Sequence, residues 1–347
     1  MNNRWTAQNR RPRARSALAL LASGALAATG LGLGTGTAHA AETLGASAAQ
    51  SGRYFGVAID PGYFNDQQYV TTLNREYNSV VAENAMKWEA TEPNQGQFDF
   101  RAGDEVVSHA ESQGMRVRGH TLVWHSQLAP WVQQLSGNEL RDAMLGHITG
   151  VAEHYRGKID SWDVVNEAFD EDGTRRDDSH FQQQLGDGYI EDAFRAADAA
   201  DPDAELCYND YNTDGLNPKS DAVYNMVADF KARGVPIDCV GFQNHLSSDT
   251  DMSTYRQNLQ RFADLGVDVQ ITELDVGGSG TPQADVYRTV TQSCLAVARC
   301  KGITVWGITD AHSWRAEETP LLFDENYRKK EAYNAVLEAL NSAGTTA

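Results

Sequence analysis

Motifs for several common chemistries are missing from this chain. No Gly-x-Gly-x-x-Gly fingerprint follows the first expected strand, which argues against a dinucleotide-binding fold. No Gly-x-Ser-x-Gly elbow is present to carry a serine nucleophile. No His-x-x-x-His or His-Glu-x-x-His pattern exists, and His120 and His125 lie five positions apart on an expected strand, which points their side chains to opposite sides. The sequence therefore predicts neither a metal nor a cofactor.

Basic residues are also scarce. The 347 residues contain 29 Lys and Arg against 48 Asp and Glu, for a formal net charge of −19. Five of the arginines lie in the first 15 residues, so the chain beyond residue 40 carries a formal charge of −24. No basic patch remains there to bind a phosphate backbone, and we expect no nucleic-acid partner. The acidity favours solubility and neutral substrates.

The N-terminus has the pattern of an export signal. Residues 16–33 are uncharged and rich in Ala, Leu and Gly, and Ala38-His39-Ala40 precedes Ala41 in the small-x-small pattern of a signal peptidase site. Residues 1–40 are therefore interpreted as a signal peptide of a secreted protein. The Gly and Thr residues of the stretch argue against a membrane anchor, and Arg10-Arg11 leaves twin-arginine export open. The basic residues are Arg4, Arg10, Arg11, Arg13 and Arg15.

The chain has four cysteines, and none forms a Cys-x-x-Cys pair, which argues against zinc and redox chemistry. An even number of cysteines in an exported chain predicts two disulfides. Three connectivities are possible from the spacing alone, and four buried free thiols are the alternative. The cysteines are Cys207, Cys239, Cys294 and Cys300.

The remainder is expected to be one domain, residues 41–341, followed by a disordered tail, 342–347. Short apolar runs alternate with amphipathic stretches such as 189–200, 221–234 and 254–266. Eight strands alternating with helices predict an α/β fold of the (β/α)8 TIM-barrel type and not an open sheet. The expected strands are Tyr54–Ile59, Ser79–Glu83, Arg116–Trp124, Ile159–Asn166, Glu205–Tyr208, Cys239–Gln243, Asp268–Thr272 and Ile303–Ile308.

Polar and aromatic side chains gather where these strands end, which is the catalytic face of such barrels. Sugar rings stack their C–H faces on indoles and need polar partners for their hydroxyls, so the set predicts a carbohydrate site. Taken singly, each residue also has a structural explanation in a turn or the core. The residues are Glu83, Asn84, Lys87, His120, Trp124, Asn166, Glu167, Asn209, Asn212, Gln243, His245, Glu273, Asp275, Trp306 and Trp314.

Two segments stand out among them. Trp162–Glu167 and Ile271–Asp275 each read as a buried strand that delivers a glutamate, Glu167 and Glu273, to a surface cleft. One such glutamate alone could end a strand in an ion pair. Two convergent carboxylates are what acetal hydrolysis requires, because one protonates the leaving oxygen and the other meets the oxocarbenium carbon.

These motifs resemble glycoside hydrolase family 10, the retaining endo-β-1,4-xylanases, in a secreted actinobacterial-type form with only the catalytic domain. The resemblance extends from about Gly52 to Leu340, with the motifs in family order. They are Glu83-Asn84-Ala85-Met86-Lys87-Trp88, Gly119-His120-Thr121-Leu122-Val123-Trp124-His125, Trp162–Glu167, Gln243-Asn244-His245, Ile271–Asp275, Trp306 and Trp314.

The resemblance implies an enzyme that cuts internal bonds of xylan by double displacement without a cofactor, and that binds xylan and xylo-oligosaccharides but no membrane. The oligomeric state stays open, although a secreted barrel this acidic is most simply a monomer. Glu167 would be the general acid/base and Glu273 the nucleophile, with carboxyl groups about 5–5.5 Å apart. Asn166 would bind the 2-hydroxyl of the attacked sugar, a contact that tightens in the transition state. The family pairing would be Cys207–Cys239 and Cys294–Cys300.

The other implied roles surround these glutamates. His245, backed by Asp275 and near Gln243, would orient the nucleophile and keep it ionised. The remaining implied contacts are His120 and Trp124 at the same sugar, Glu83, Asn84 and Lys87 at the next sugar toward the non-reducing end, and Trp306 and Trp314 as a roof that excludes a hydroxymethyl group. Asn244 stands where the family often has a smaller residue.

Two alternatives stay open at this point. A related barrel could act mainly on β-1,4-glucan, which faster hydrolysis of carboxymethylcellulose than of xylan would reveal. A carbohydrate-binding protein could keep the cleft without the chemistry, although Asn166, His245 and Asp275 beside both glutamates argue against it.

Overall fold

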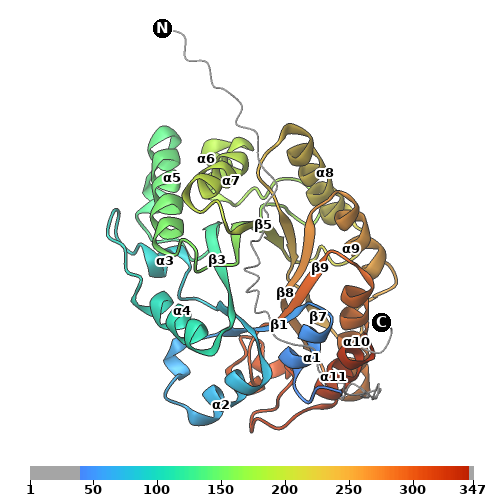
Figure 1. The fold of residues 1–347 in the computed structure, drawn as a ribbon. Coiled ribbons are helices and arrows are strands. Elements are labelled where there is room, and N and C mark those ends of the chain that lie inside the picture. Colours follow the sequence, from blue (N-terminus) through green and yellow to red (C-terminus); the bar gives the residue numbers. More distant parts are fainter. Residues whose placement is uncertain (1–39, 344–347) are drawn as a thin grey trace, which may run out of the picture. The chain divides into compact units, whose positions relative to one another are not determined.

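The computed structural model describes residues 40–343, so most of the predicted signal peptide and residues 344–347 lie outside the described residues. Figure 1 shows strands surrounded by helices. The strands run in the order β6-β5-β4-β3-β2-β1-β9-β8, and β6 pairs with β8 to close the sheet. Every pairing in the sheet is parallel. The predicted (β/α)8 barrel is confirmed.

All eight expected strands are present. The strands are β1 (Tyr54–Ile59), β2 (Ser79–Ala82), β3 (Arg116–Trp124), β4 (Ser161–Asn166), β5 (Glu205–Asp210), β6 (Cys239–Phe242), β7 (His245–Ser247), β8 (Asp268–Gly277) and β9 (Cys300–Val305). The short strand β7 was not expected. It arises because Asn244, with φ of 62°, breaks the sixth strand into β6 and β7. Strand β8 runs on to Gly277, beyond its expected end at Thr272, because β7 pairs with its last residues.

Helices cover the barrel between the strands. They are α1 (Leu44–Gln50), α2 (Gln67–Glu76), α3 (Trp88–Thr91), α4 (Arg101–Gln113), α5 (Gly137–His154), α6 (His180–Leu185), α7 (Gly188–Ala200), α8 (Pro218–Arg233), α9 (Tyr255–Asp264), α10 (Gly280–Ala296) and α11 (Glu331–Ala343). Local sequence fixes their ends. The Asn217 side chain accepts from the Ser220 amide at 2.8 Å before Pro218 starts α8, and Gly234, with φ of 69°, ends it. No helix within residues 40–343 is long and apolar enough to cross a membrane.

A buried polar network fills the barrel below the catalytic face. Arg118 Nε donates to Asp163 Oδ2 at 3.0 Å, and Arg118 Nη1 donates to Gln270 Oε1 at 2.7 Å. The Tyr54 hydroxyl donates to the same Gln270 oxygen at 2.8 Å. Because the buried cation and carboxylate are paired and hydrogen-bonded, their desolvation is compensated. This network fixes the strands whose ends carry the site.

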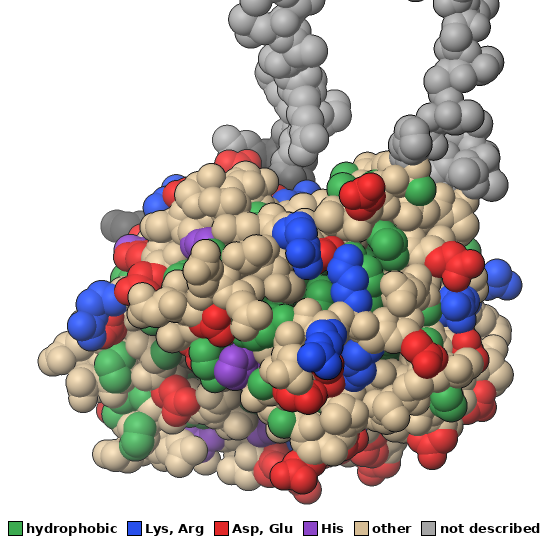
Figure 2. Space-filling view, turned by 90° about the horizontal axis from the view of Figure 1, so that it is seen from below, with side chains coloured by type: hydrophobic (Ala, Val, Ile, Leu, Met, Phe, Trp, Pro, Cys, Tyr) green, Lys and Arg blue, Asp and Glu red, His purple; other side chains and the backbone are tan. Residues whose placement is uncertain are grey.

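The described ends of the chain are tied together. Asn341 in α11 accepts from the Ala41 amide at 3.1 Å and donates to the Ala41 carbonyl at 3.0 Å. Helix α11 extends to Ala343 and so enters the segment 342–347 that was expected to be disordered. On the face drawn in Figure 2, acidic side chains are spread widely and Lys and Arg side chains lie among them.

Both predicted disulfides are present. Cys207–Cys239 joins β5 to β6 at register partners, with a Cα–Cα distance of 4.5 Å. Cys294–Cys300 ties the end of α10 to the start of β9, with a Cα–Cα distance of 5.3 Å. No free cysteine remains among the described residues, so the alternative of buried thiols is excluded.

Candidate active site

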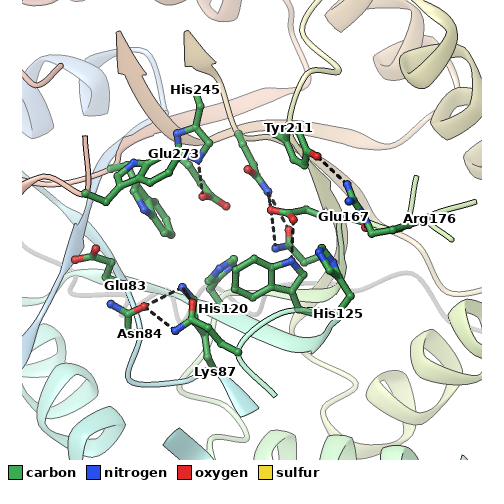
Figure 3. Close-up of a pocket in the computed structure, with 16 residues that line it drawn as sticks. Glu83, Asn84, Lys87, His120, His125, Glu167, Arg176, Tyr211, His245 and Glu273 are labelled. Carbon is green, nitrogen blue, oxygen red and sulfur yellow. Dashed lines mark hydrogen bonds and ion pairs between the residues drawn. The ribbon is translucent and has the colours of Figure 1, made fainter. Parts of the chain in front are cut away.

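The cleft at the carboxyl ends of the strands has a volume of about 500 Å³ (Figure 3). Of the predicted site residues, all line this cleft except three. Asp275 lies behind His245 as expected, and Asn209 and Asn212 do not line the cleft. The lining residues are Glu83, Asn84, Lys87, His120, Trp124, His125, Gln127, Asn166, Glu167, Arg176, Tyr211, Gln243, His245, Glu273, Trp306 and Trp314.

Glu273 is held on β8 by two donors. Strand alternation points Glu273 and Asp275 to the same side, because they are two residues apart. His245 Nε2 lies 3.1 Å from Glu273 Oε2, and Asn209 Nδ2 donates to Glu273 Oε1 at 2.8 Å. The carboxylate is only 4% exposed. Both of its oxygens are therefore fixed, and one of them faces a cation.

His245 is that cation. Its Nδ1 lies 3.1 Å from Asp275 Oδ1 while its Nε2 contacts Glu273. Burial alone lowers the pKa of His245, but the two carboxylates outweigh it and raise the pKa to about 10. Asp275 is compensated further by Arg315 Nη1 at 2.6 Å and by the Trp314 indole N–H at 2.8 Å. The imidazolium is thus locked between two acids.

Glu167 follows β4 in a left-handed backbone conformation, with φ of 58°. The Trp124 indole N–H donates to its Oε2 at 2.8 Å, and Gln243 Nε2 donates to its Oε1 at 3.0 Å. Asn166 Nδ2 lies 3.4 Å from the same Oε1. Neutral donors therefore hold the side chain of this glutamate, in contrast to Glu273.

Asn209 connects the two glutamates, a role that the sequence did not reveal. Its Nδ2 donates to Asn166 Oδ1 at 2.9 Å as well as to Glu273, and Asn166 contacts Glu167. The space for this amide exists because residue 241 is glycine, since a Cβ there would lie 2.2 Å from Asn209 Oδ1. Strand 5 was expected to deliver Asn209 to this face, but only the structure shows its partners.

A second polar cluster lies at one end of the cleft, where Figure 3 shows Glu83, Asn84 and Lys87 together. Lys87 Nζ donates to Asn84 Oδ1 at 2.9 Å and to Gln127 Oε1 at 2.7 Å. It also lies 4.9 Å from the centroid of the Trp124 ring. Burial raises the pKa of Glu83 and lowers the pKa of Lys87, because each side chain has lost water around its charge. Polar groups of a ligand would replace the hydrogen bonds that this water made. The cluster suits a ligand rich in hydroxyls.

Aromatic side chains form another wall. Trp306 is 7% exposed and packs edge-on against His120, with ring centroids 5.4 Å apart. His120 Nδ1 lies 2.9 Å from Asp163, so the buried network orients it. Trp314 is 60% exposed, donates its indole N–H to Asp275 and packs edge-on against His245, with ring centroids 5.0 Å apart. Indole surface therefore remains free to meet a ligand.

One expectation about neighbouring residues was wrong. His120 and His125 both line the cleft, and do not point to opposite sides, because the register of β3 shifts after His120 and His125 lies beyond the strand. Asn244 does not enter the cleft. It is fully buried, donates to Asp214, and accepts from the Tyr255 hydroxyl at 2.7 Å. The larger side chain at 244 is thus accommodated outside the cleft.

Gln127, Arg176 and Tyr211 also line the cleft without having been predicted. All three lie in loops after strands, where no periodicity marks a side chain. For Tyr211 the signal was its place directly after β5. Among the described residues, no group of three or more His, Cys, Asp or Glu side chains is placed to hold a metal ion.

A parallel barrel whose cleft combines indoles, amides and two glutamates on separate strands defines a glycoside hydrolase. The model of glycosyl hydrolase family 10 matches residues 43–339. The chain belongs to this family.

Relatives with known names agree with this assignment. The chain is 44% identical over 290 residues to endo-1,4-beta-xylanase 3 of Hypocrea jecorina, covering 83% of this chain and 82% of that protein. Native xylanase 10B of Thermotoga maritima superposes with a TM-score of 0.84 at 39% identity, covering 87% of this chain and 99% of that one. Xylanase 10B of Thermotoga petrophila, solved with xylobiose, gives a TM-score of 0.84 at 38% identity over 87% and 98% of the two chains.

Proposed function

We propose that the protein is a secreted, retaining endo-β-1,4-xylanase in which Glu273 is the nucleophile and Glu167 the general acid/base. The enzyme class is supported by the family and by the relatives that are named xylanases. The observation that carries the two roles is the contrast in surroundings. Glu273 faces the His245 imidazolium, whereas neutral donors hold the side chain of Glu167.

Glu273 is the better nucleophile because its charge is stabilised before substrate arrives. An imidazolium and an amide that donate to a buried carboxylate compensate for the water that its charge has lost. Those two donors also fix its orientation, which brings it to the anomeric carbon without a search over rotamers. Attack expels the leaving oxygen and forms a covalent glycosyl-enzyme.

Glu167 supports the other half of the chemistry. In the first step its proton moves to the glycosidic oxygen as the C–O bond breaks. In the second step its carboxylate takes a proton from water, which attacks the glycosyl-enzyme and releases Glu273. Two displacements at one carbon retain the configuration. Asn166, beside Glu167 and bound to Asn209, is placed for the 2-hydroxyl, whose contact strengthens as the ring flattens.

The substrate follows from the walls of the cleft. Glu83, Asn84 and Lys87 offer polar partners to a sugar beyond the reacting one, toward the non-reducing end, and His120 and Trp124 line the reacting subsite. Trp306 and Trp314 line the cleft, and the family resemblance supports their role as a roof that excludes a hydroxymethyl group and so favours xylose over glucose. The actinobacterial-type form stays a prediction, since the curated relatives named for comparison are fungal. Secretion and a monomeric state are likewise proposed.

The test is to incubate the purified protein with xylan and with carboxymethylcellulose, following reducing ends, product sizes and the first-formed anomer by ¹H NMR. Short xylo-oligosaccharides released as the β-anomer from xylan are the expected result. Faster hydrolysis of carboxymethylcellulose than of xylan would make β-1,4-glucan the main substrate. Release of the α-anomer first would show an inverting mechanism. No product from either polymer would favour a carbohydrate-binding protein. For variants of the two glutamates, Glu317→Ala, at an exposed glutamate, is the matched control.

A further inference from the structure

Arg176, in the loop after β4, holds three consecutive backbone carbonyls. Its Nε donates to the Glu167 carbonyl at 2.7 Å and its Nη2 donates to the Phe169 carbonyl at 3.2 Å. Its own backbone amide donates to the Ala168 carbonyl between them at 3.0 Å. A single residue thus spans the whole turn that carries Glu167 into the cleft.

That turn needs support because of its backbone conformation. Glu167 has φ of 58°, a left-handed value that is unfavourable for a residue with a side chain and persists only where the surroundings impose it. The Glu167 amide donates to the Asn209 carbonyl at 2.9 Å. With Arg176 on the carbonyl, both polar groups of the Glu167 backbone are occupied. These two backbone hydrogen bonds fix the turn and therefore the direction of the Glu167 side chain.

Arg176 also brings a positive charge to the cleft. Its Nη2 donates to the Tyr211 hydroxyl at 2.8 Å, and Figure 3 shows this contact beside Glu167. Burial alone lowers the pKa of Arg176, but the Tyr211 hydrogen bond and the charges of Asp210 and Glu167 outweigh it and raise the pKa, so the side chain stays a cation. It is 9% exposed, with Asp170 at 3.6 Å.

We propose that Arg176 is a positioning residue for Glu167. Its fork of donors fixes the left-handed turn and so the place of the Glu167 carboxyl group in the cleft. The proposal rests on the assignment of Glu167 as the acid/base. Arg176 does not reach the reacting atoms in this account, and it acts only through Glu167.

Other charged groups act on the same pair, and the test must hold them constant. Burial lowers the pKa of His125, beyond β3, and the charges of Glu167 and Arg176 act on it in opposite directions. Lys87 and Asp210 interact with Glu167 through their charges, Asp170 and Asp178 lie 3.6 and 3.8 Å from Arg176 Nη1, and Glu273 lines the same cleft.

The experiment compares Arg176→Lys and Arg176→Gln with the wild type on two substrates. One is xylohexaose, whose leaving group needs a proton, and the other is 2,4-dinitrophenyl β-xylobioside, whose leaving group needs none. Arg176→Lys keeps the charge but not the fork, so kcat/KM should fall about ten- to a hundredfold on xylohexaose and change less than about threefold on the aryl substrate. Arg176→Gln removes the charge as well as the fork, so its loss on xylohexaose should be at least as large as that of Arg176→Lys, again with little change on the aryl substrate.

The control is Arg175→Lys. Arg175 is the adjacent arginine, lies over the Phe169 ring at 4.3 Å, and makes no contact with Glu167. This variant should match the wild type on both substrates. Active enzyme is counted in every sample by titration with a 2-fluoro glycoside, so that misfolded protein does not enter kcat.

Equal losses on the two substrates would overturn the proposal and reduce Arg176 to a structural residue. An unchanged xylohexaose rate in Arg176→Lys would overturn it as well. If Arg176→Gln does not fold, Arg176→Lys alone decides whether Arg176 positions Glu167 or only stabilises the fold. Failure of the proposed function is a separate result, since it would appear as a wild type without xylanase activity.

Discussion

His245 Nε2 lies 3.1 Å from Glu273 Oε2, although the two residues are 28 positions apart. The contact exists because β7 pairs with β8 in register, with His245 opposite Asp275. A break in the sixth strand at Asn244 makes this pairing possible. The imidazolium that results distinguishes Glu273 from Glu167, and the roles of the two glutamates follow from that difference.

The first prediction separates the two glutamates. Glu273→Ala should abolish turnover of every substrate, because no covalent intermediate can form. Glu167→Ala should keep kcat/KM for 2,4-dinitrophenyl β-xylobioside within about tenfold of the wild type while losing about 10²–10⁴-fold on xylohexaose. Steady-state kinetics on both substrates give the answer. Equal losses for both variants on both substrates would contradict the assignment.

A second prediction concerns pH and stability. The pKa of His245 is raised from 6.5 to about 10 in the folded protein. A raised pKa means that the fold binds this proton more tightly, so its contribution is fully present below pH ~6.5 and is lost as the pH rises through about 10. The difference in melting temperature between the wild type and His245→Gln should therefore shrink steadily between those values.

His109→Gln is the matched control for that series, since burial lowers the pKa of His109 instead of raising it. Its melting-temperature difference from the wild type should not shrink over the same range. A constant difference for His245→Gln from pH ~6 to ~10 would show that His245 is not charged in the fold.

The third prediction ranks the two disulfides. Cys207–Cys239 spans 32 positions and Cys294–Cys300 spans six, so the longer loop restricts the unfolded chain more. Replacing the first pair by alanine should lower the free energy of unfolding by about 4 kcal/mol, and replacing the second by about 2 kcal/mol. Urea unfolding of the two double variants tests the order. A larger loss for the short loop would show that native packing dominates.

A fourth prediction concerns sugar selectivity. Trp314 is mostly exposed and held through its indole N–H, so Trp314→Ala should remove one side of the roof without disturbing the core. The ratio of kcat/KM for aryl xylobioside over aryl cellobioside should fall about tenfold. Trp314→Phe keeps much of the ring and should fall less. An unchanged ratio in Trp314→Ala would locate selectivity elsewhere in the cleft.

The fifth prediction concerns export. Cleavage after Ala40 should leave Ala41 as the first residue of the protein recovered from the medium, which intact-mass analysis can verify. Ala38→Phe should block cleavage, because the site needs a small residue there. A mature protein that keeps residues 1–40 would contradict the signal peptide.

The fold could be predicted from the sequence because the strands of a parallel barrel are covered on both faces and therefore appear in the sequence as apolar runs. Strands such as β1 and β3 appear with the bounds that were expected. The break at Asn244 could not be predicted, because its left-handed conformation depends on buried hydrogen bonds of its side chain to Asp214 and Tyr255, which lie on other elements. Local propensity carries no trace of such contacts.

The site could be predicted from the sequence to a similar extent. Residues that end strands, such as Glu167 and Glu273, inherit their position from the barrel, so their convergence could be expected. Arg176 and Gln127 lie in loops, and their partners are fixed only by the folded backbone. His125 was misplaced because strand alternation was extended past a register shift in β3. Loop geometry was the missing information in each case.

The most direct test of the central claim is to trap the covalent intermediate. A 2-deoxy-2-fluoro xylobioside with a dinitrophenyl leaving group should inactivate the enzyme with release of one equivalent of dinitrophenol. Peptide mass mapping should then find the sugar on Glu273, in the segment Ile271–Asp275. A label on Glu167 or on any other residue, or turnover of xylan with no label at all, would contradict the account.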